Sequence, residues 1–470
     1  MKIHNSILVA VAAAIFLCTS CIDDETREER EKIEADSDYD AKVYLRKEYM
    51  DTYYYWYKEV KDRNAGLKPY NYSSVNQFFK ALLFSGDHWS WMEDGESYRN
   101  SESGTIAGGT WAASFCQPVE SLQDYGIYVK YLYPGSPLER HGVTRGAKLL
   151  GINGCEWGEQ VRTEEQAEAV NNGLAKSPAT FHFRLEDGAE VSFTESWSTN
   201  FHTDYILECR TFGPEDFPLL TEDVGYLHYL SFKEDLIKSV EEAMSFLKSA
   251  GVRKIILDLR YNGGGSGNAS DELMGYIAPD IAVEKEYVKR IHNDKYSKWD
   301  QSSKVPNKKS ERINPDAIYI ITGPGTASAS EIVINGLKPY MEGRLHLVGQ
   351  NTYGKPNGMY VWGYPKDLDK AEWVFLPICF FNMNSLKEQI PLEGFTPDYE
   401  CIDDVYHNFG AGEANIAACL THIATGRYPD RILRSKGPLT RASSGIELKS
   451  LAPEDETDFN YGVYSFVLPE

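Results

Sequence analysis

The sequence lacks the patterns of a metal enzyme and the charge of a nucleic-acid-binding protein. Beyond residue 21 it contains no Cys-x-x-Cys pair, and it contains no His-Glu-x-x-His run, so neither a zinc site nor a dense disulfide framework is indicated. Its formal net charge is −22, whereas binding to nucleic-acid phosphates requires a basic surface. We therefore expect no nucleic-acid partner and no metal or nucleotide cofactor, and we interpret the acidity as an aid to solubility.

The apolar run near the N-terminus is shorter than a membrane span. Ile7–Leu17 contains 11 residues and is followed by Thr19-Ser20-Cys21, an order typical of a secretory signal. Small residues before a cysteine resemble a bacterial lipoprotein processing site, although Cys18 stands where leucine is usual. The resemblance predicts that residues 1–20 are a signal peptide and that Cys21 carries a lipid anchor in a membrane. The alternative is a plain secretory signal.

An acidic segment follows this cysteine. Residues 22–40 hold ten acidic and three basic side chains, which is typical of a solvated tether, here residues 21–40. An acidic stretch at this place also resembles the surface-export signal of Bacteroidetes lipoproteins. The resemblance implies an outer-membrane lipoprotein of the cell envelope, on either its periplasmic or its surface-exposed side.

The rest of the chain divides into regions of different pattern. Residues 41–105 carry aromatic and apolar side chains at helical spacing, which predicts a small helical N-terminal domain. Residues 106–200 consist of short alternating runs broken by glycine and proline, which indicates a β domain. Residues 205–430 alternate strand and helix patterns, and residues 431–470 form a C-terminal extension. We therefore predict a multidomain protein that combines α/β and α+β parts.

Part of the second region resembles a PDZ domain. Its Ser136-Pro137, Gly142-Val143, Gly146 and Ile152-Asn153-Gly154 match the usual PDZ run, and Ala147 stands where that run has aspartate. The Asn-Gly pair also predicts a tight hairpin turn. PDZ domains bind extended C-termini by adding them as a strand. The resemblance therefore implies protein or peptide partners with free C-termini.

The pattern of the third region predicts a parallel α/β core. Its apolar runs alternate only weakly with polar residues, as expected for strands that are buried on both faces. We predict helices over 234–249 and 270–277, and strands over 224–230, 254–260, 317–322, 345–349 and 373–381.

One serine of this core lies where a nucleophile is expected. Ser328 falls between the strand 317–322 and a helix-compatible run from Glu331 to Leu337. At a helix N-terminus the backbone N–H groups point outward, which suits a nucleophile whose intermediate carries an oxyanion. The chain lacks the Gly-x-Ser-x-Gly elbow of α/β-hydrolases. The base must therefore come from elsewhere, and Ser330 is the competing nucleophile.

Lys355 is the candidate base. It lies 27 residues after Ser328, in Tyr353-Gly354-Lys355. A lysine with the ordinary pKa of ~10.4 cannot accept a proton at neutral pH, but burial among apolar groups lowers the pKa by several units. The alternatives are a surface lysine in a glycine-rich turn, or a Ser-His-Asp triad that uses His228 or His346. Both histidines lie inside apolar strand patterns, which favours packed core histidines.

Several motifs in a fixed order resemble the serine–lysine carboxy-terminal processing peptidases, the family that also contains the tricorn protease core. After the PDZ-like segment come Asp258–Gly265, Thr326–Glu331, Tyr353–Lys355 and Gly394–Asp398. The resemblance covers roughly residues 40–405. It implies a peptidase core of the ClpP/crotonase-like α/β type, with Ser328 as nucleophile, Lys355 as base and Glu331 as a third catalytic member.

The resemblance also places the oxyanion donors and shows one departure. The donors would be the backbone N–H groups of Ala329 and of the glycine turn, Gly263 and Gly264; no Gly-Lys-Ser/Thr follows this turn, which argues against phosphate binding. Many family members carry a glutamine four residues after the lysine, which orients it, and here Met359 occupies that position. Glu331 or a backbone carbonyl would then orient Lys355.

Together these patterns predict a secreted, membrane-tethered serine endopeptidase. A PDZ domain would present unfolded or C-terminal protein segments to Ser328 and Lys355. The alternative is a non-catalytic peptide-binding or scaffold lipoprotein that retains the peptidase fold, for which Met359 is the only argument.

Overall fold

The computed structural model describes residues 27–118, 124–308 and 311–430. The predicted signal peptide, Cys21 and the C-terminal extension lie outside the described residues. The chain divides into two compact units, of which the first joins the residues up to Glu96 with His292–Lys298 and Met359–Phe380. Among the helices that the structure describes, none is long and apolar enough to span a membrane.

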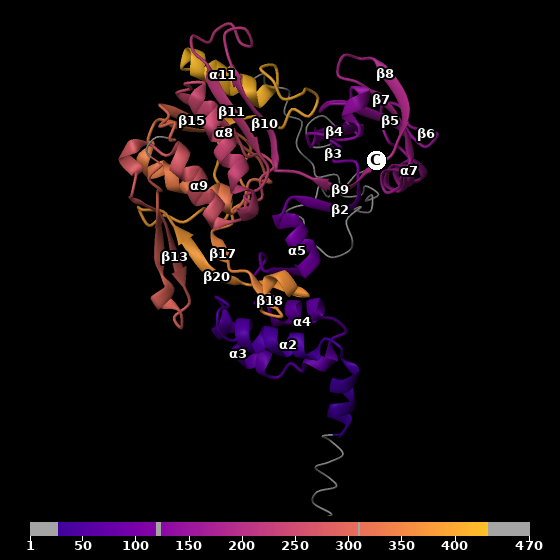
Figure 1. The fold of residues 1–470 in the computed structure, drawn as a ribbon, viewed down its shortest axis with the longest axis vertical. Helices are drawn as coiled ribbons and strands as arrows, with labels where there is room; N and C mark the ends of the chain where they lie inside the picture. The colour runs from indigo at the N-terminus through magenta and orange to yellow at the C-terminus, as the bar shows by residue number, and fades with distance from the viewer. Residues whose placement is uncertain (1–26, 119–123, 309–310, 431–470) are drawn as a thin grey trace, which may run out of the picture. The chain divides into compact units, whose positions relative to one another are not determined.

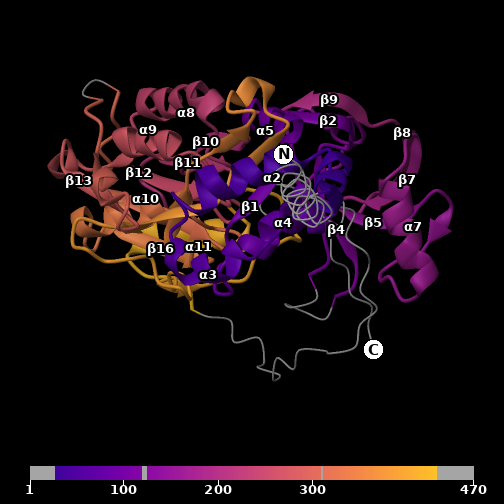
Figure 2. The ribbon, with the colours of Figure 1, turned by 90° about the horizontal axis from the view of Figure 1, so that it is seen from below.

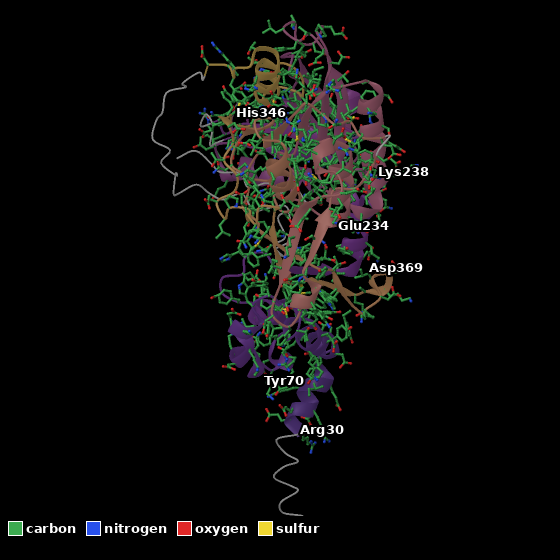
Figure 3. The ribbon with its side chains drawn as sticks, turned by 90° about the vertical axis from the view of Figure 1, so that its left-hand side faces the viewer. Arg30, Tyr70, Glu234, Lys238, His346 and Asp369 are labelled. Carbon is green, nitrogen blue, oxygen red and sulfur yellow. The ribbon has the colours of Figure 1, made fainter. Side chains whose placement is uncertain are left out.

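Where the structure describes it, the acidic segment near the N-terminus is helical, whereas the sequence analysis predicted a solvated tether. Residues 27–35 form a largely exposed helix. Ion pairs one turn apart, Arg27 with Glu31 and Glu28 with Lys32, favour a helix here despite the excess of acid. The Tyr70 hydroxyl donates to Glu29 at 2.6 Å; Arg30 and Tyr70 are labelled in Figure 3.

The first unit is helical, as predicted, and contains a small sheet. Four buried aromatic or apolar residues of the helix α4, among them Phe78 and Phe79, pack against the preceding helices, and the Ser74 side chain caps α4 by accepting from the Gln77 N–H. The helical elements are α2 (Tyr39–Tyr44), a π-helix (Leu45–Met50), α3 (Tyr57–Ala65) and α4 (Val75–Leu82). The antiparallel sheet has the order β1 (Trp91–Asp94), β19 (Trp373–Leu376), β18 (Trp362–Tyr364), and α5 (Gly95–Glu102) follows β1 in the chain.

The prediction that 373–381 belongs to the α/β core is therefore wrong for Trp373–Leu376. This strand pairs with β1 in a register that places Phe375 opposite Met92. Phe375 is fully buried, with its ring 6.4 Å from that of Phe79. The sequence of an apolar strand does not specify which hydrophobic core the strand joins. Here Phe375 packs in the aromatic core of the first unit.

The second unit begins with a β domain. Its antiparallel sheet has the order β3-β4-β5-β7-β8, with β6 paired to β5. Asn153 and Gly154 both have positive φ, 51° and 82°, which confirms the hairpin turn predicted between β5 and β6. The helix α7 (Glu164–Leu174) begins at a capping box formed by Thr163 and Gln166. The strands are β3 (Ala113–Cys116), β4 (Ile127–Leu132), β5 (Lys148–Ile152), β6 (Cys155–Glu156), β7 (Ala179–Arg184) and β8 (Glu190–Glu195); outside this sheet, β2 (Thr105–Thr110) pairs with β9 (Ser198–His202).

A six-stranded sheet forms the centre of the second unit. Its order is β10-β11-β12-β15-β16-β21, and all neighbours are parallel except the antiparallel pair β10–β11. The predicted strands at 317–322 and 345–349 are confirmed with the predicted ends, and those at 224–230 and 254–260 are confirmed but end one and two residues earlier. The strands are β10 (Ile206–Phe212), β11 (Val224–Tyr229), β12 (Lys254–Asp258), β15 (Ala317–Thr322), β16 (Leu345–Gly349) and β21 (Tyr399–Glu400).

Helices cover both faces of this sheet. On one face α8, α9 and α10 pack against alternate strand residues such as Leu257 and Ile320. On the other face α11 packs against Ile256 and Ile321, and Figures 1 and 2 show α8 and α9 on the side opposite α11. Because both faces of the central strands are buried, β12 and β15 are mostly apolar. The helices are α8 (Ile237–Ser249), α9 (Gly267–Ile277), α10 (Ala329–Leu337) and α11 (Ala414–Thr425); a further sheet has the order β14 (Gln301–Lys304), β13 (Glu286–His292), β20 (Ile378–Met383), β17 (Asn357–Met359).

Candidate active site

Ser328 is the N-cap residue of α10, directly beyond the turn that leaves β15. Its backbone has φ 56° and ψ −114°, a conformation that residues with a side chain rarely adopt and that is found mainly at functional sites. Its N–H donates to Oε2 of Glu331 at 3.0 Å, and its side chain is partly exposed. The structure thus holds an accessible hydroxyl on a strained turn at a helix N-terminus.

Ser330, the competing nucleophile, has a different environment. It is fully buried, and its hydroxyl donates to the backbone carbonyl of Asn262 at 3.0 Å. That bond ties α10 to the turn after β12. Of the two serines, only Ser328 has a hydroxyl that a substrate can reach.

Glu331 joins the segments that carry Ser328 and Lys355. Its buried carboxylate accepts four hydrogen bonds: from the Ser328 N–H at 3.0 Å, the Thr352 hydroxyl at 2.6 Å, the Gly354 N–H at 2.8 Å and the Lys355 N–H at 2.9 Å. Burial raises the pKa of Glu331 above its ordinary value, and the four donors oppose this without cancelling it. Glu331 therefore fixes the backbone on both sides of the site.

Lys355 is half-buried and follows a left-handed glycine, Gly354, with φ 90°. Its N–H and that of Ser328 bind the same oxygen of Glu331, so the fold brings together two residues that lie 27 positions apart in the chain. Beyond it, Asn357 is fully buried. Neither polar atom of the Asn357 carboxamide has a hydrogen-bond partner within the described structure.

The glycine turn after β12 packs directly on the Ser328 turn. Gly264 has φ +105°, and a Cβ atom there would lie 2.7 Å from the Cβ of Ser328. The N–H of Gly264, one of the predicted oxyanion donors, donates to the Asn262 side chain at 2.8 Å. Ala329 is the first residue of α10, where an N–H has no partner within the helix. Gly263 and Ala329 stay predicted donors.

Gly264 gives a steric test of this packing. In Gly264→Ala the new methyl group meets Ser328 and requires a left-handed backbone, which costs about 1–3 kcal/mol. We expect the predicted peptidase activity to fall at least ~100-fold, because displacement of a reacting group by about 1 Å has that effect. Gly267→Ala is the matched control, since its Cβ meets only the end of the flexible Arg290 side chain. Equal activity of the two variants, with equal melting temperatures, would contradict this packing.

Two positioning residues were missed by the sequence analysis. Asn262 accepts at its carbonyl from the Ala327 N–H at 3.0 Å as well as from Ser330. Thr352 donates to Glu331, and its hydroxyl accepts from the Phe395 N–H at 2.7 Å. Asn262 lies within the recognised motif Asp258–Gly265, and Thr352 directly precedes Tyr353–Lys355. Position in or beside a motif was the only signal of their roles, because the side-chain direction of a loop residue depends on the tertiary structure.

A buried ion cluster supports the glycine turn from the other side. The Arg260 guanidinium pairs with Asp258 at 2.8 Å and with Glu413 at 2.7 Å. Arg145 of the β domain pairs with Asp403 at 2.8 Å and donates to the hydroxyl of Tyr261, the residue after Arg260, at 2.7 Å. Burial alone would raise the pKa of Asp403, but the charges of Arg145 and Arg260 hold it well below its usual range.

The two histidines of the alternative triad lie within the sheet. His228 is fully buried in β11, where burial lowers its pKa to about 4, and its ring is 4.5 Å from that of Phe409. This confirms a packed core histidine. His346, labelled in Figure 3, is half-buried in β16 and stacks on Tyr319 at 4.6 Å. Within the described ranges, no group of three or more His, Cys, Asp or Glu residues is arranged to hold a metal ion.

Comparison with known proteins gives one consistent family. Residues 223–401 match peptidase family S41, and residues 47–91 match the peptidase S41 N-terminal domain. The first match spans β11 to the residues beyond β21 and includes Ser328 and Lys355.

Curated relatives are similar over about half of their length. Carboxyl-terminal-processing peptidase 3, chloroplastic, of Arabidopsis thaliana is 26% identical over 57% of this chain and 49% of its own. Carboxy-terminal processing protease CtpA of Bacillus subtilis is 23% identical over 56% of this chain and 52% of its own. This chain therefore spans about half the length of the curated relatives that it matches.

A solved structure is similar over most of the chain. A putative S41 protease from Bacteroides fragilis NCTC 9343 superposes with a TM-score of 0.65 and 21% sequence identity, over 80% of this chain and 96% of that chain. At this identity the likeness shows the fold alone.

Proposed function

This chain belongs to peptidase family S41, and we propose that it is a serine endopeptidase with Ser328 as nucleophile and Lys355 as base. The observation that carries the proposal is the buried Glu331 carboxylate, which accepts hydrogen bonds from the backbone of both residues. A buried carboxylate with four internal donors holds the segments that donate to it in fixed positions. Its burial between two loops that are distant in sequence has a structural cost, which a shared active site explains.

The chemistry follows from the geometry of the turn. The neutral amine of Lys355 takes the proton of the Ser328 hydroxyl while its oxygen attacks the peptide carbonyl. The N–H groups of Ala329 and Gly263 then stabilise the oxyanion of the tetrahedral intermediate. The Lys355 ammonium returns a proton to the leaving amine as the C–N bond breaks. In the second half of the reaction, Lys355 takes a proton from a water molecule as that water attacks the acyl-enzyme. Lys355 then returns the proton to the Ser328 oxygen as the ester bond breaks.

The orientation of the Lys355 amine requires an acceptor for its N–H hydrogens. Met359 cannot supply one, because a thioether is at most a weak acceptor. Glu331 or a backbone carbonyl is the proposed orienting group for the Lys355 amine.

The β domain is the proposed binding site for the substrate chain. Its antiparallel sheet and helix α7 support the PDZ resemblance, and PDZ domains bind peptide C-termini by strand addition. The proposed substrates are unfolded or C-terminal protein segments with free carboxylates. We also propose lipid anchoring at Cys21 in the cell envelope. Protease accessibility on whole cells would distinguish a surface-exposed from a periplasmic protein.

The function is tested with an unfolded polypeptide in two forms, one with a free C-terminal carboxylate and one with a C-terminal amide. We expect cleavage of both, with a lower KM for the free carboxylate because only that form fits a carboxylate-binding loop. Fragments are followed by electrophoresis and mass spectrometry. Binding of the polypeptide without any cleavage would favour the non-catalytic scaffold, the alternative for which Met359 argues. Equal KM values would contradict only the proposed binding of C-termini and would leave the proposed peptidase function standing.

A further inference from the structure

The sequence motif Gly394–Asp398 lies against the base loop, defined here as Thr352–Lys355. The Thr352 N–H donates to the Phe395 carbonyl at 3.1 Å, and the Phe395 N–H donates to the Thr352 hydroxyl oxygen at 2.7 Å. Because hydrogen bonds are directional, two opposed bonds between one pair of residues keep the two loops from sliding past each other. The motif contains none of the proposed reacting groups, so its contribution is to the position of the loop that it contacts.

Both loops have a left-handed glycine where their backbones meet. Gly394 has φ +76°, and a Cβ atom there would overlap the carbonyl oxygen of Thr352. Gly354 has φ +90°, and a Cβ atom there would overlap the carbonyl oxygen of Leu392. A side chain at either position would therefore separate the loops. The contact is backbone against backbone, and it reaches the residue that directly precedes Lys355.

The motif is itself anchored in the core of the second unit. The Asp398 N–H donates to the carbonyl of Leu347 in β16, and the Leu347 N–H donates to the Asp398 carboxylate, each at 2.8 Å. The Phe395 side chain is buried and belongs to the apolar core that also contains Ala329 and Val333 of α10. The motif therefore holds the base loop against a fixed support.

The Thr352 hydroxyl connects this contact to Glu331. Since the hydroxyl oxygen accepts from the Phe395 N–H, its single proton is left to donate, and it donates to Oε1 of Glu331. The distance of 2.6 Å is typical of a hydroxyl that donates to a charged oxygen. With its four donors, Glu331 has no lone pair left for a proton unless one donor is displaced.

The charge of Glu331 depends on this hydroxyl. Burial raises the pKa of Glu331, and of the four donors that oppose the rise, the Thr352 hydroxyl has the largest effect. A protonated Glu331 would donate from one oxygen, and it would lose one of the N–H groups of Ser328, Gly354 or Lys355 that it now accepts. Removal of the hydroxyl therefore shifts Glu331 toward a form that no longer anchors both sides of the site.

We propose that the motif Gly394–Asp398 is a positioning clamp for the catalytic base: it orients the Thr352 hydroxyl, which keeps Glu331 as the carboxylate that anchors Ser328 and Lys355. The inference rests on the proposed peptidase function and adds to it positioning residues that touch neither the substrate nor the reacting atoms. It predicts that cleavage requires an ionised Glu331.

Thr352→Val removes the hydroxyl and keeps the size of the side chain. At low pH we expect its kcat to be about 10-fold below wild type, the size of one hydrogen bond to a charged group. The deficit should shrink as pH rises between about pH 5 and 9, because Glu331 then ionises again. Protonation of Lys355 affects both enzymes alike and cancels from the ratio of their kcat values. Thr352→Ser retains the hydroxyl and should keep the ratio near one. A loss of packing alone would give a ratio that does not depend on pH.

Matched controls separate the clamp from general damage. Thr421→Val removes a hydroxyl that donates to the Ala417 carbonyl within α11 at 2.7 Å, and its kcat should equal that of wild type at every pH. Gly394→Ala should lower kcat with the same pH dependence as Thr352→Val. Gly343→Ala is its control, because Gly343 is also left-handed, with φ +68°, but a Cβ atom there meets nothing within 4 Å. Equal kcat of the two alanine variants would overturn the clamp.

Melting temperatures test the clamp without catalysis. Because the pKa of Glu331 is raised in the folded state, its contribution to stability is present below the ordinary carboxyl pKa and is lost as pH rises through the folded pKa. Thr352→Val raises the folded pKa further, so its loss of stability should extend to higher pH than in wild type. A pH-independent kcat ratio for Thr352→Val would overturn the clamp and leave the proposed function intact. Absence of cleavage by wild type, together with the shifted melting profile, would overturn the proposed function alone.

Discussion

Ser328→Ala is expected to lower kcat/KM on an unfolded polypeptide by at least ~10⁴-fold. Removing the nucleophile of a serine peptidase leaves only the rate that the oxyanion donors and substrate binding provide. The side chain of Ser328 packs at a helix N-terminus that Glu331 holds through the backbone N–H, so the substitution should change the melting temperature little. Initial rates of fragment release, with circular dichroism for folding, measure both effects.

Ser330→Ala is the matched control for this substitution. It removes one buried hydrogen bond, to the Asn262 carbonyl, and should cost about 1 kcal/mol of stability while cleavage continues. Lys355→Ala should lose about as much activity as Ser328→Ala, because nucleophile and base act as a unit. If Ser328→Ala cleaved as fast as wild type, or if Ser330→Ala alone were inactive, the assignment of the nucleophile would be wrong.

Glu331→Gln is expected to give the second-largest loss, about 10²- to 10³-fold in kcat with a smaller change in KM. The carboxylate of Glu331 accepts four hydrogen bonds, whereas a carboxamide has only one accepting oxygen and turns an NH₂ group toward donors. The backbone of Ser328 and Lys355 then loses its common anchor, and small displacements of reacting groups are costly in rate. Steady-state kinetics on one peptide separate kcat from KM.

The same variant changes the pH dependence of stability. Burial raises the pKa of Glu331 in the folded state, so between the ordinary carboxyl pKa and the raised one the folded protein binds more protons than the unfolded chain. Stability of wild type therefore falls as pH rises through that window, and Glu331→Gln lacks this fall. Melting temperatures between pH 4 and 8 measure it. Glu342→Gln, at an exposed acid, should keep the wild-type dependence; if it lost the fall as well, Glu331 would not be its source.

Much of the fold was predictable because local patterns agreed with it. The strands of the central sheet are buried on both faces, so their apolar runs stand out, and the Asn153-Gly154 turn carries its own conformational signal. Trp373–Leu376 was misassigned because an apolar strand can pair with any compatible edge. The helix over residues 27–35 was missed because acidic composition hides the ion pairs one turn apart that favour it.

For the site, the sequence by itself determined the chemical groups: a serine before a helix, a lysine in a glycine-rich loop and a glycine turn, in the order found in family S41. Only the tertiary structure decided how they work together. It engaged the Gly264 N–H with Asn262, buried Ser330, and placed the Glu331 carboxylate where it binds the backbone of Ser328 and Lys355 at once. Hydrogen bonds between loops depend on distances and directions across the fold, and residue order along the chain does not contain them.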